Sequence, residues 1–252
     1  MDLFRSVKSD LYKLRHTLIL WMHILIPLLC SVIFLAYYSI SSWKAKDKVS
    51  AYFEFVAVTF PLLIGLICSM VVSQEEQAGN FQELLTGSKW RWAALISKLI
   101  LFILGSFFFI FIALSIFGIG FQYVLNENNF TLSCYVQVGI GLLLGNIILY
   151  ILHTFLSLRY GKGASIGGGI VGSLICAIMI TGLGDRIWKV IPWAWAVRFC
   201  DYSVLSEINS SLYNMVQSEL KEGVIIMAID TLVALVMILI WFSSWEGRKS
   251  LE

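Results

Sequence analysis

Six long apolar stretches constrain this chain more than any other feature of its sequence. They cover residues 18–40, 52–72, 96–121, 134–157, 164–183 and 224–242, and none has Lys or Arg in its middle. A bilayer core of roughly 30 Å is crossed by about 20 apolar residues in a helix. Strands of membrane barrels alternate in polarity, whereas these stretches are continuously apolar. The sequence therefore predicts an all-α membrane protein with six transmembrane helices.

Charge is scarce along the chain. Of 252 residues, 18 are basic and 16 acidic, and 59% are hydrophobic. Soluble domains have about 25% charged residues, so this composition excludes most soluble enzymes. The net charge of +2 is too small to predict a nucleic-acid partner. Six spans leave no room for a soluble domain, so residues 1–252 are expected to form a single membrane domain.

The distribution of Lys and Arg predicts the orientation. With an even number of spans both ends lie on one side, and that side would carry more than half of the 18 basic residues. Basic residues concentrate in cytoplasmic loops. We therefore expect a multi-pass protein of the plasma membrane with both termini in the cytoplasm.

Two segments outside the spans have helical periodicity. In residues 1–17, basic side chains fill the gaps between apolar residues at three- and four-residue intervals, namely Leu3, Phe4, Val7, Leu11 and Leu14. This pattern is typical of an interfacial helix in the headgroup plane, although a plain extension of the first span remains an alternative. In the outer loop, residues 184–223, the same intervals predict one half-buried helix over the outer mouth of the bundle, built on Val204, Leu205, Ile208, Leu212, Met215 and Val216.

The loop between the second and third spans is the most polar cytoplasmic segment. Acidic residues come first, at Glu75, Glu76 and Glu83, and basic residues follow at Lys89, Arg91 and Lys98. Phe81, Leu84 and Leu85 supply a short apolar face at helical spacing, and Gly79 permits a sharp turn before it. This pattern predicts a short helix across the membrane surface that offers its outer face to a cytoplasmic partner. A solvated connector is the alternative.

Motifs for catalysis are missing from the sequence. It contains no phosphate-binding Gly-x-x-x-x-Gly-Lys-Ser/Thr string, no His-Glu-x-x-His and no Gly-x-Ser-x-Gly. We therefore expect no catalytic residues, no cofactor and no metal site, and not an enzyme.

Asp230 lies about seven residues into the last span. A carboxylate there costs at least a few kcal/mol, so it should face the bundle interior, a partner or water. A transport role and a helix-packing hydrogen bond both remain open.

The close-approach spacings Gly141-x-x-x-Gly145 and Gly168-x-x-x-Gly172 indicate either packing within the bundle or a dimer seam.

The order of these segments resembles the permease subunits of type-2 ABC exporters. That family often carries a loop with Glu, three residues, Gly, four residues, Leu-Leu and then a basic stretch, and the matching positions here are Glu75, Gly79, Leu84, Leu85, Arg91 and Lys98. The chain departs from the family at Gly87, where Pro is common, and at Glu76, where a basic residue is common. The resemblance implies a coupling helix, with Glu75, Glu76, Gly79, Phe81, Leu84 and Leu85 in contact with a separate ABC ATPase subunit.

A narrower resemblance links the chain to the MutG-type permeases of lantibiotic-immunity transporters. It rests on residues 13–17, Lys13-Leu-Arg-His-Thr, and on residues 21–29 at the first span. It implies export of an amphipathic antimicrobial peptide from the bilayer, giving self-immunity to a producer strain, and a second permease subunit as a homo- or heterodimer partner. Charge reversal at Glu75 or Glu76 should then uncouple ATP hydrolysis from protection. An exporter of another drug, bacitracin-like peptide or ion is the alternative, and a membrane scaffold or enzyme without an ATPase is a third.

Overall fold

The computed structural model describes residues 2–15, 17–86, 91–127 and 130–248. Within these ranges it is helical and without strands. Six helices are long and apolar enough to cross a membrane: α2 (Leu18–Ile40), α3 (Ala45–Gln77), α5 (Arg91–Tyr123), α6 (Leu132–Tyr160), α7 (Lys162–Met179) and α9 (Ser210–Ser244). The predicted fold class and the six spans are confirmed.

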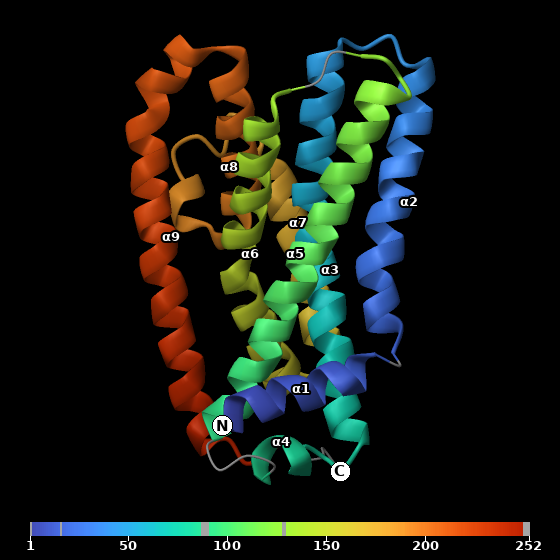
Figure 1. Cartoon of the computed structure of the whole chain (residues 1–252). Coiled ribbons are helices and arrows are strands. Elements are labelled where there is room, and N and C mark those ends of the chain that lie inside the picture. The colour runs from blue at the N-terminus through green and yellow to red at the C-terminus, as the bar shows by residue number, and fades with distance from the viewer. Residues whose placement is uncertain (1, 16, 87–90, 128–129, 249–252) are drawn as a thin grey trace.

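The long helices run side by side (Figure 1). The helices α1 (Asp2–Leu14) and α4 (Gln82–Thr86) lie across one end, together with the last turns of α9. We call this the terminal end, and the opposite one the far end. The short helix η1 (Trp188–Val190) and the helix α8 (Pro192–Ile208) lie between α7 and α9 in the chain.

Several helices extend well beyond the apolar stretch that identified them. Helix α3 has 33 residues against a predicted span of residues 52–72, and α9 has 35. At 1.5 Å per residue such helices are about 50 Å long, which exceeds a hydrocarbon core of roughly 30 Å. The excess turns are polar and protrude at the ends. Because hydropathy detects only the apolar part of a helix, the lengths predicted from the sequence were too short.

The core lies along α3 and α6, which are the most buried of the six, whereas α9 and α2 are the least buried. Glycine permits the closest crossings. A Cβ atom added at Gly141 would lie 2.7 Å from Cβ of Phe199, and one at Gly145 would lie 2.7 Å from the backbone nitrogen of Ala196. Both contacts are with α8, so this glycine spacing packs two helices of the same chain.

The expectation for the outer loop was wrong in two respects. The residues predicted to form one helix are divided at Asn209, where α8 ends and α9 begins, because the Asn209 side chain accepts a hydrogen bond from the nitrogen of Leu212 and caps α9. Helix α8 also packs into the bundle rather than over its mouth, with Trp195 and Val197 fully buried. Helix α7 ends at Met179 rather than near residue 183, and η1 and α8 occupy the remaining depth (Figure 1).

Candidate functional site

The candidate site is an elbow at the terminal end, where α3 turns into α4. Backbone nitrogens of Asn80 and Phe81 donate to the carbonyl oxygens of Glu76 and Glu75, at 2.8 and 3.1 Å, and end α3. Gly79 has φ of 151°, which side chains other than glycine rarely adopt. Asn80 and Phe81 also have positive φ, at 50° and 68°. A bulky residue with positive φ is strained, so packing must hold Phe81 in place.

A charged cluster of Asp10, Lys13, Glu75, Glu83 and Lys98 ties this elbow to the rest of the terminal end. Lys98 Nζ lies 2.8 Å from Glu75 Oε1 and 3.3 Å from Asp10 Oδ1. Lys13 Nζ lies 3.3 Å from Glu75 Oε1 and 2.9 Å from Glu83 Oε2. Four helices, α1, α3, α4 and α5, are therefore joined by one alternating set of charges.

Burial makes the centre of the charged cluster costly to disturb. Lys98 is 5% exposed and Glu75 is 7% exposed. Buried charges need partners, and removing one member of a buried ion pair strongly destabilises the folded protein. Ser97 also donates a hydrogen bond to Asp10, at 2.5 Å between the oxygens. Burial lowers the pKa of Lys13, but the carboxylates of Glu83 and Glu75 outweigh it, so the pKa is raised and Lys13 stays charged at neutral pH.

A second set of contacts fastens the elbow to the C-terminal segment. Arg248 Nη1 lies 3.2 Å from Glu76 Oε1, and Arg248 Nη2 donates to the carbonyl oxygen of Ser157 at 3.0 Å. The Arg248 guanidinium lies 5.7 Å from the centre of the Phe81 ring. Trp245 meets the same ring edge-on, at 5.1 Å between centroids. These contacts bury Phe81 completely and explain how its strained backbone is held.

The predicted coupling residues differ in whether their side chains are buried or exposed. Glu75, Phe81 and Leu84 are buried, Glu76 and Leu85 are partly buried, and Gly79 is exposed. The residues that face outward on α4 are Gln82, Glu83 and Thr86. The buried residues hold the elbow on the bundle, and the exposed ones form its surface. Of the basic stretch that follows, Gly87 and Lys89 lie outside the described residues.

Sequence reasoning missed the partners of Glu75. Asp10 and Lys13 were assigned to a surface helix and not to the elbow, although α1 packs directly against α5. Lys98 was the one sequence feature that pointed to such a contact, because a lysine just inside an apolar span needs a carboxylate nearby. Nothing local in the sequence indicates which carboxylate it meets.

Asp230 lies partly buried on α9. Among the described residues it forms no ion pair or hydrogen bond, and the buried hydroxyl of its neighbour Thr231 has no hydrogen-bond partner there either. Within the same ranges, no three His, Cys, Asp or Glu side chains are grouped so that they could hold a metal ion. The role of Asp230 stays a prediction.

A pair of carboxylates lies at the far end, away from the elbow. Burial raises the pKa of Asp201, on α8, to about 8, and the negative charge of Glu54, on α3, adds to the shift. Arg198 opposes the shift, but its guanidinium is shared with Asp185, at 2.8 Å, and with the carbonyl oxygen of Thr181, at 2.9 Å. Asp201 is therefore protonated for much of the time at neutral pH.

Six bilayer-length helices and a polar elbow anchored at one end define a multi-pass helical membrane protein. The chain belongs to the ABC-2 family of transporter proteins, whose family model matches residues 6–181, more than half of the chain. It is thus a membrane permease subunit of an ABC transporter, which works with a partner ATPase and is not itself the catalytic subunit. Comparisons with curated proteins and with solved structures gave no match.

Proposed function

We propose that this permease exports a lantibiotic-type amphipathic peptide from the plasma membrane, and that its partner ATPase docks on the outward face of α4. The contacts of the charged cluster support the proposal that the ATPase docks on α4. The exposed Glu83 on α4 reaches through Lys13 to the buried pair of Glu75 and Lys98. A displacement of α4 would therefore pull on α1, α3 and α5 together.

The proposed orientation places the terminal end in the cytoplasm. Three cationic side chains of the first helical segment, Arg5, Lys8 and Arg15, are exposed there. Lys and Arg favour the cytoplasmic side of a membrane. An ATPase that uses cytoplasmic ATP would then meet α4 directly.

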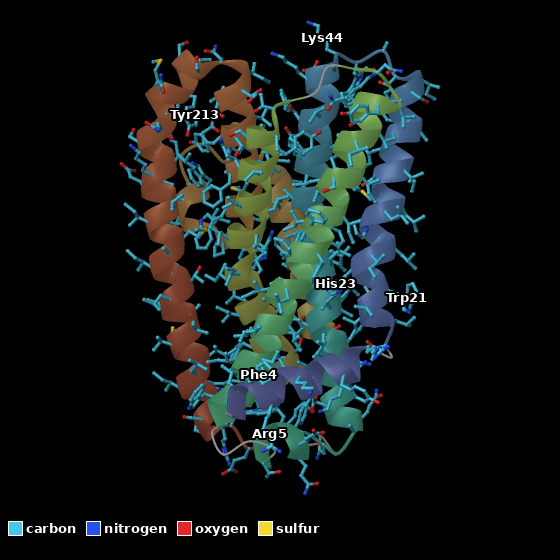
Figure 2. All side chains as sticks on the ribbon, viewed as in Figure 1. Phe4, Arg5, Trp21, His23, Lys44 and Tyr213 are labelled. Carbon is cyan, nitrogen blue, oxygen red and sulfur yellow. The ribbon has the colours of Figure 1, made fainter. Side chains whose placement is uncertain are left out.

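Helix α1 fits a position in the inner headgroup layer. Its exposed face combines the apolar side chains of Phe4 and Leu11 with the cationic one of Lys8, and the exposed Arg15 directly follows the helix. Phe4 lies nearer the middle of the bundle than its neighbour Arg5 (Figure 2). This arrangement suits a helix with apolar groups in the acyl boundary and cations at the phosphates. The opposite face contributes Asp10 and Lys13 to the charged cluster.

The coupling mechanism follows from these contacts. ATP binding would close two ATPase subunits, which would shift α4 at each permease. Leu84 of α4 and Phe81, which precedes α4, are both buried, so we expect α4 and the end of α3 to move together. Trp245 contacts Phe81, so the end of α9 would move as well. The shift of a permease pair, as a homo- or heterodimer, would then release the peptide outward. The peptide class rests on the resemblance in the first thirty residues.

The test reverses the exposed charge of α4 in cells that express the complete transporter. In Glu83→Lys we expect protection against the peptide to fall to the level of cells without the permease, while the ATPase still hydrolyses ATP. Because Glu83 is 58% exposed, its replacement should not unfold the protein. Asp47→Lys, an exposed acid at the far end, is the matched control and should protect normally.

A second variant separates docking from internal pairing. Lys13→Gln removes the partner of Glu83 within the chain but leaves the negative charge of Glu83 on the surface of α4. We expect this variant to protect normally. Full protection in Glu83→Lys, or a loss of protection in Lys13→Gln as large as that in Glu83→Lys, would show that α4 does not receive the ATPase through Glu83.

A further inference from the structure

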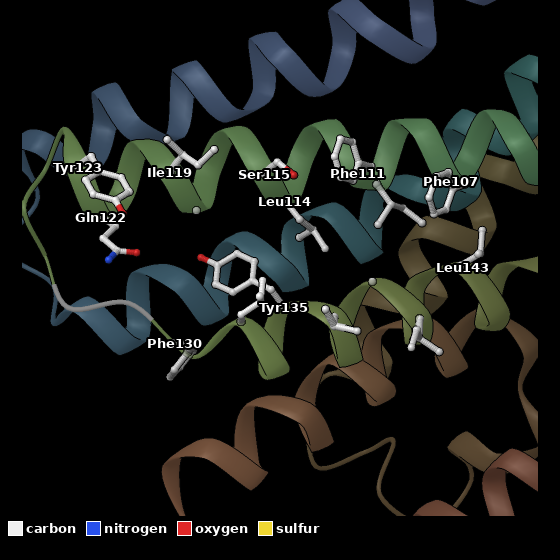
Figure 3. A pocket seen from close by; sticks show the side chains of 16 residues that line it. Phe107, Phe111, Leu114, Ser115, Ile119, Gln122, Tyr123, Phe130, Tyr135 and Leu143 are labelled. Carbon is white, nitrogen blue, oxygen red and sulfur yellow. The ribbon is translucent and has the colours of Figure 1, made fainter.

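A groove of about 490 Å³ lies between α5 and α6, in the half of the bundle toward the far end. Figure 3 shows the two helices as its walls and the side chain of Tyr135 reaching from α6 toward α5. The volume is within the range of roughly 300–1,000 Å³ that is typical of ligand pockets. The groove is unrelated to the elbow, which lies at the other end of the molecule.

One glycine on each wall leaves space in the groove. A Cβ atom added at Gly118, on α5, would lie 3.1 Å from Cε1 of Tyr135, and one at Gly139, on α6, would lie 3.4 Å from Cδ1 of Leu114. Larger residues at either position would therefore extend into this space. The Tyr135 ring itself packs edge-on against Phe53 of α3, at 5.0 Å between centroids, which gives the groove a firm aromatic floor.

The lining changes in polarity along the groove. Toward the middle of the bundle it is apolar, with the exposed rings of Phe107 and Phe111 on α5 and the side chain of Ile140 on α6. Toward the far end it is bordered by Gln122 and by Tyr123, which is 70% exposed. None of the described residues that line it is charged. The groove therefore has an apolar end and a polar, uncharged end, as an amphiphile does.

The position of the groove within the membrane indicates which kind of molecule fills it. Its apolar part lies within the hydrophobic stretches of α5 and α6, at residues 96–121 and 134–157, so the surrounding medium is hydrocarbon. Water in such a groove would find few polar partners. An empty groove would lose the dispersion contacts of its walls. A cationic peptide would find no carboxylate to pair with its charges among the described lining residues.

We infer that this groove binds one acyl chain of a phospholipid from the leaflet at the far end, with the headgroup beside Gln122 and Tyr123. The acyl chain would lie along Phe107, Phe111 and Ile140. An acyl chain in a concave, glycine-lined site makes more contacts than one against a convex helix surface, so this lipid should exchange more slowly than its neighbours. The inference requires the membrane-spanning fold but not the proposed peptide substrate.

The experiment measures lipid retention on the purified full-length chain. The protein is loaded with palmitoyl-oleoyl-phosphatidylglycerol in detergent, washed, and weighed intact by native mass spectrometry. We expect one phospholipid per chain to remain on the native protein. In Gly139→Leu, whose new side chain enters the groove, retention should fall by about tenfold as the apolar contact is lost. Ser115→Leu, on the opposite wall, should have the same effect and covers the case in which Gly139→Leu fails to fold.

The matched control is Ala36→Leu, which adds similar bulk to an exposed position near the far end of α2 and should leave retention unchanged. Equal retention in all four proteins would overturn the inference, because the lipid would then lie elsewhere. Absence of retained lipid from the native protein would also overturn it. So would a native protein that retains lipid only as a monomer and loses it on dimerising, since a second copy would then cover the groove.

Discussion

Removing the carboxylate of Glu75 should destabilise the permease far more than removing the exposed carboxylate of Glu83, although both belong to the charged cluster. In Glu75→Gln, the Lys98 side chain, 6% exposed, keeps only Asp10, at 3.3 Å. Lys13 keeps only Glu83, at 2.9 Å. The variant thus leaves a buried ammonium with one carboxylate where it had two.

The magnitude follows from burial. Breaking a buried ion pair by deleting one partner costs about 3–5 kcal/mol. Since each lysine retains another carboxylate, we expect the lower end, about 3 kcal/mol, for Glu75→Gln. Glu83 is 58% exposed, and exposed pairs contribute about 0–1 kcal/mol, so Glu83→Gln should be nearly neutral.

Equilibrium unfolding in mixed micelles, followed by the fluorescence of the nine tryptophans, measures both free energies. Adding Lys98→Met gives a double-mutant cycle, in which we expect Glu75 and Lys98 to be coupled by about 1–3 kcal/mol. A cost for Glu75→Gln no greater than that for Glu83→Gln, or a coupling near zero, would show that the buried pair does not hold the elbow.

Two further predictions concern the bundle and its far end. Gly65→Ala should lower the free energy of unfolding by about 1–3 kcal/mol, because its Cβ atom would lie 2.6 Å from the carbonyl oxygen of Ser165, whereas Gly167→Ala, with nothing within 4 Å, should not. Asp201 binds its proton more tightly when folded, with a pKa of about 8 against 3.8, so stability should fall as pH rises from about 4 to 8 and then level off. Asp201→Asn should flatten this decline in melting temperature between pH 4 and 8, and an unchanged slope would contradict the assignment.

The elbow shows where prediction from sequence reached its limit. Its position, its turn at Gly79 and the apolar face of Phe81, Leu84 and Leu85 were all readable, because turn chemistry and helical spacing are local properties. The direction of those side chains was not. Phe81 faces inward because Trp245 and Arg248, more than 160 residues further along the chain, pack against it.

By itself the sequence determined the class of fold. Hydropathy acts residue by residue along a helix, and a bilayer needs a fixed apolar length, so six spans and their order could be read from the chain. The glycine spacing at Gly141 and Gly145 likewise indicated a close crossing. Only the tertiary structure decided that this crossing is with α8, that Asn209 separates two helices, and that Glu75 pairs with residues of α1 and α5. These contacts depend on which helices lie next to one another, and that depends on the packing of the whole bundle rather than on the local sequence.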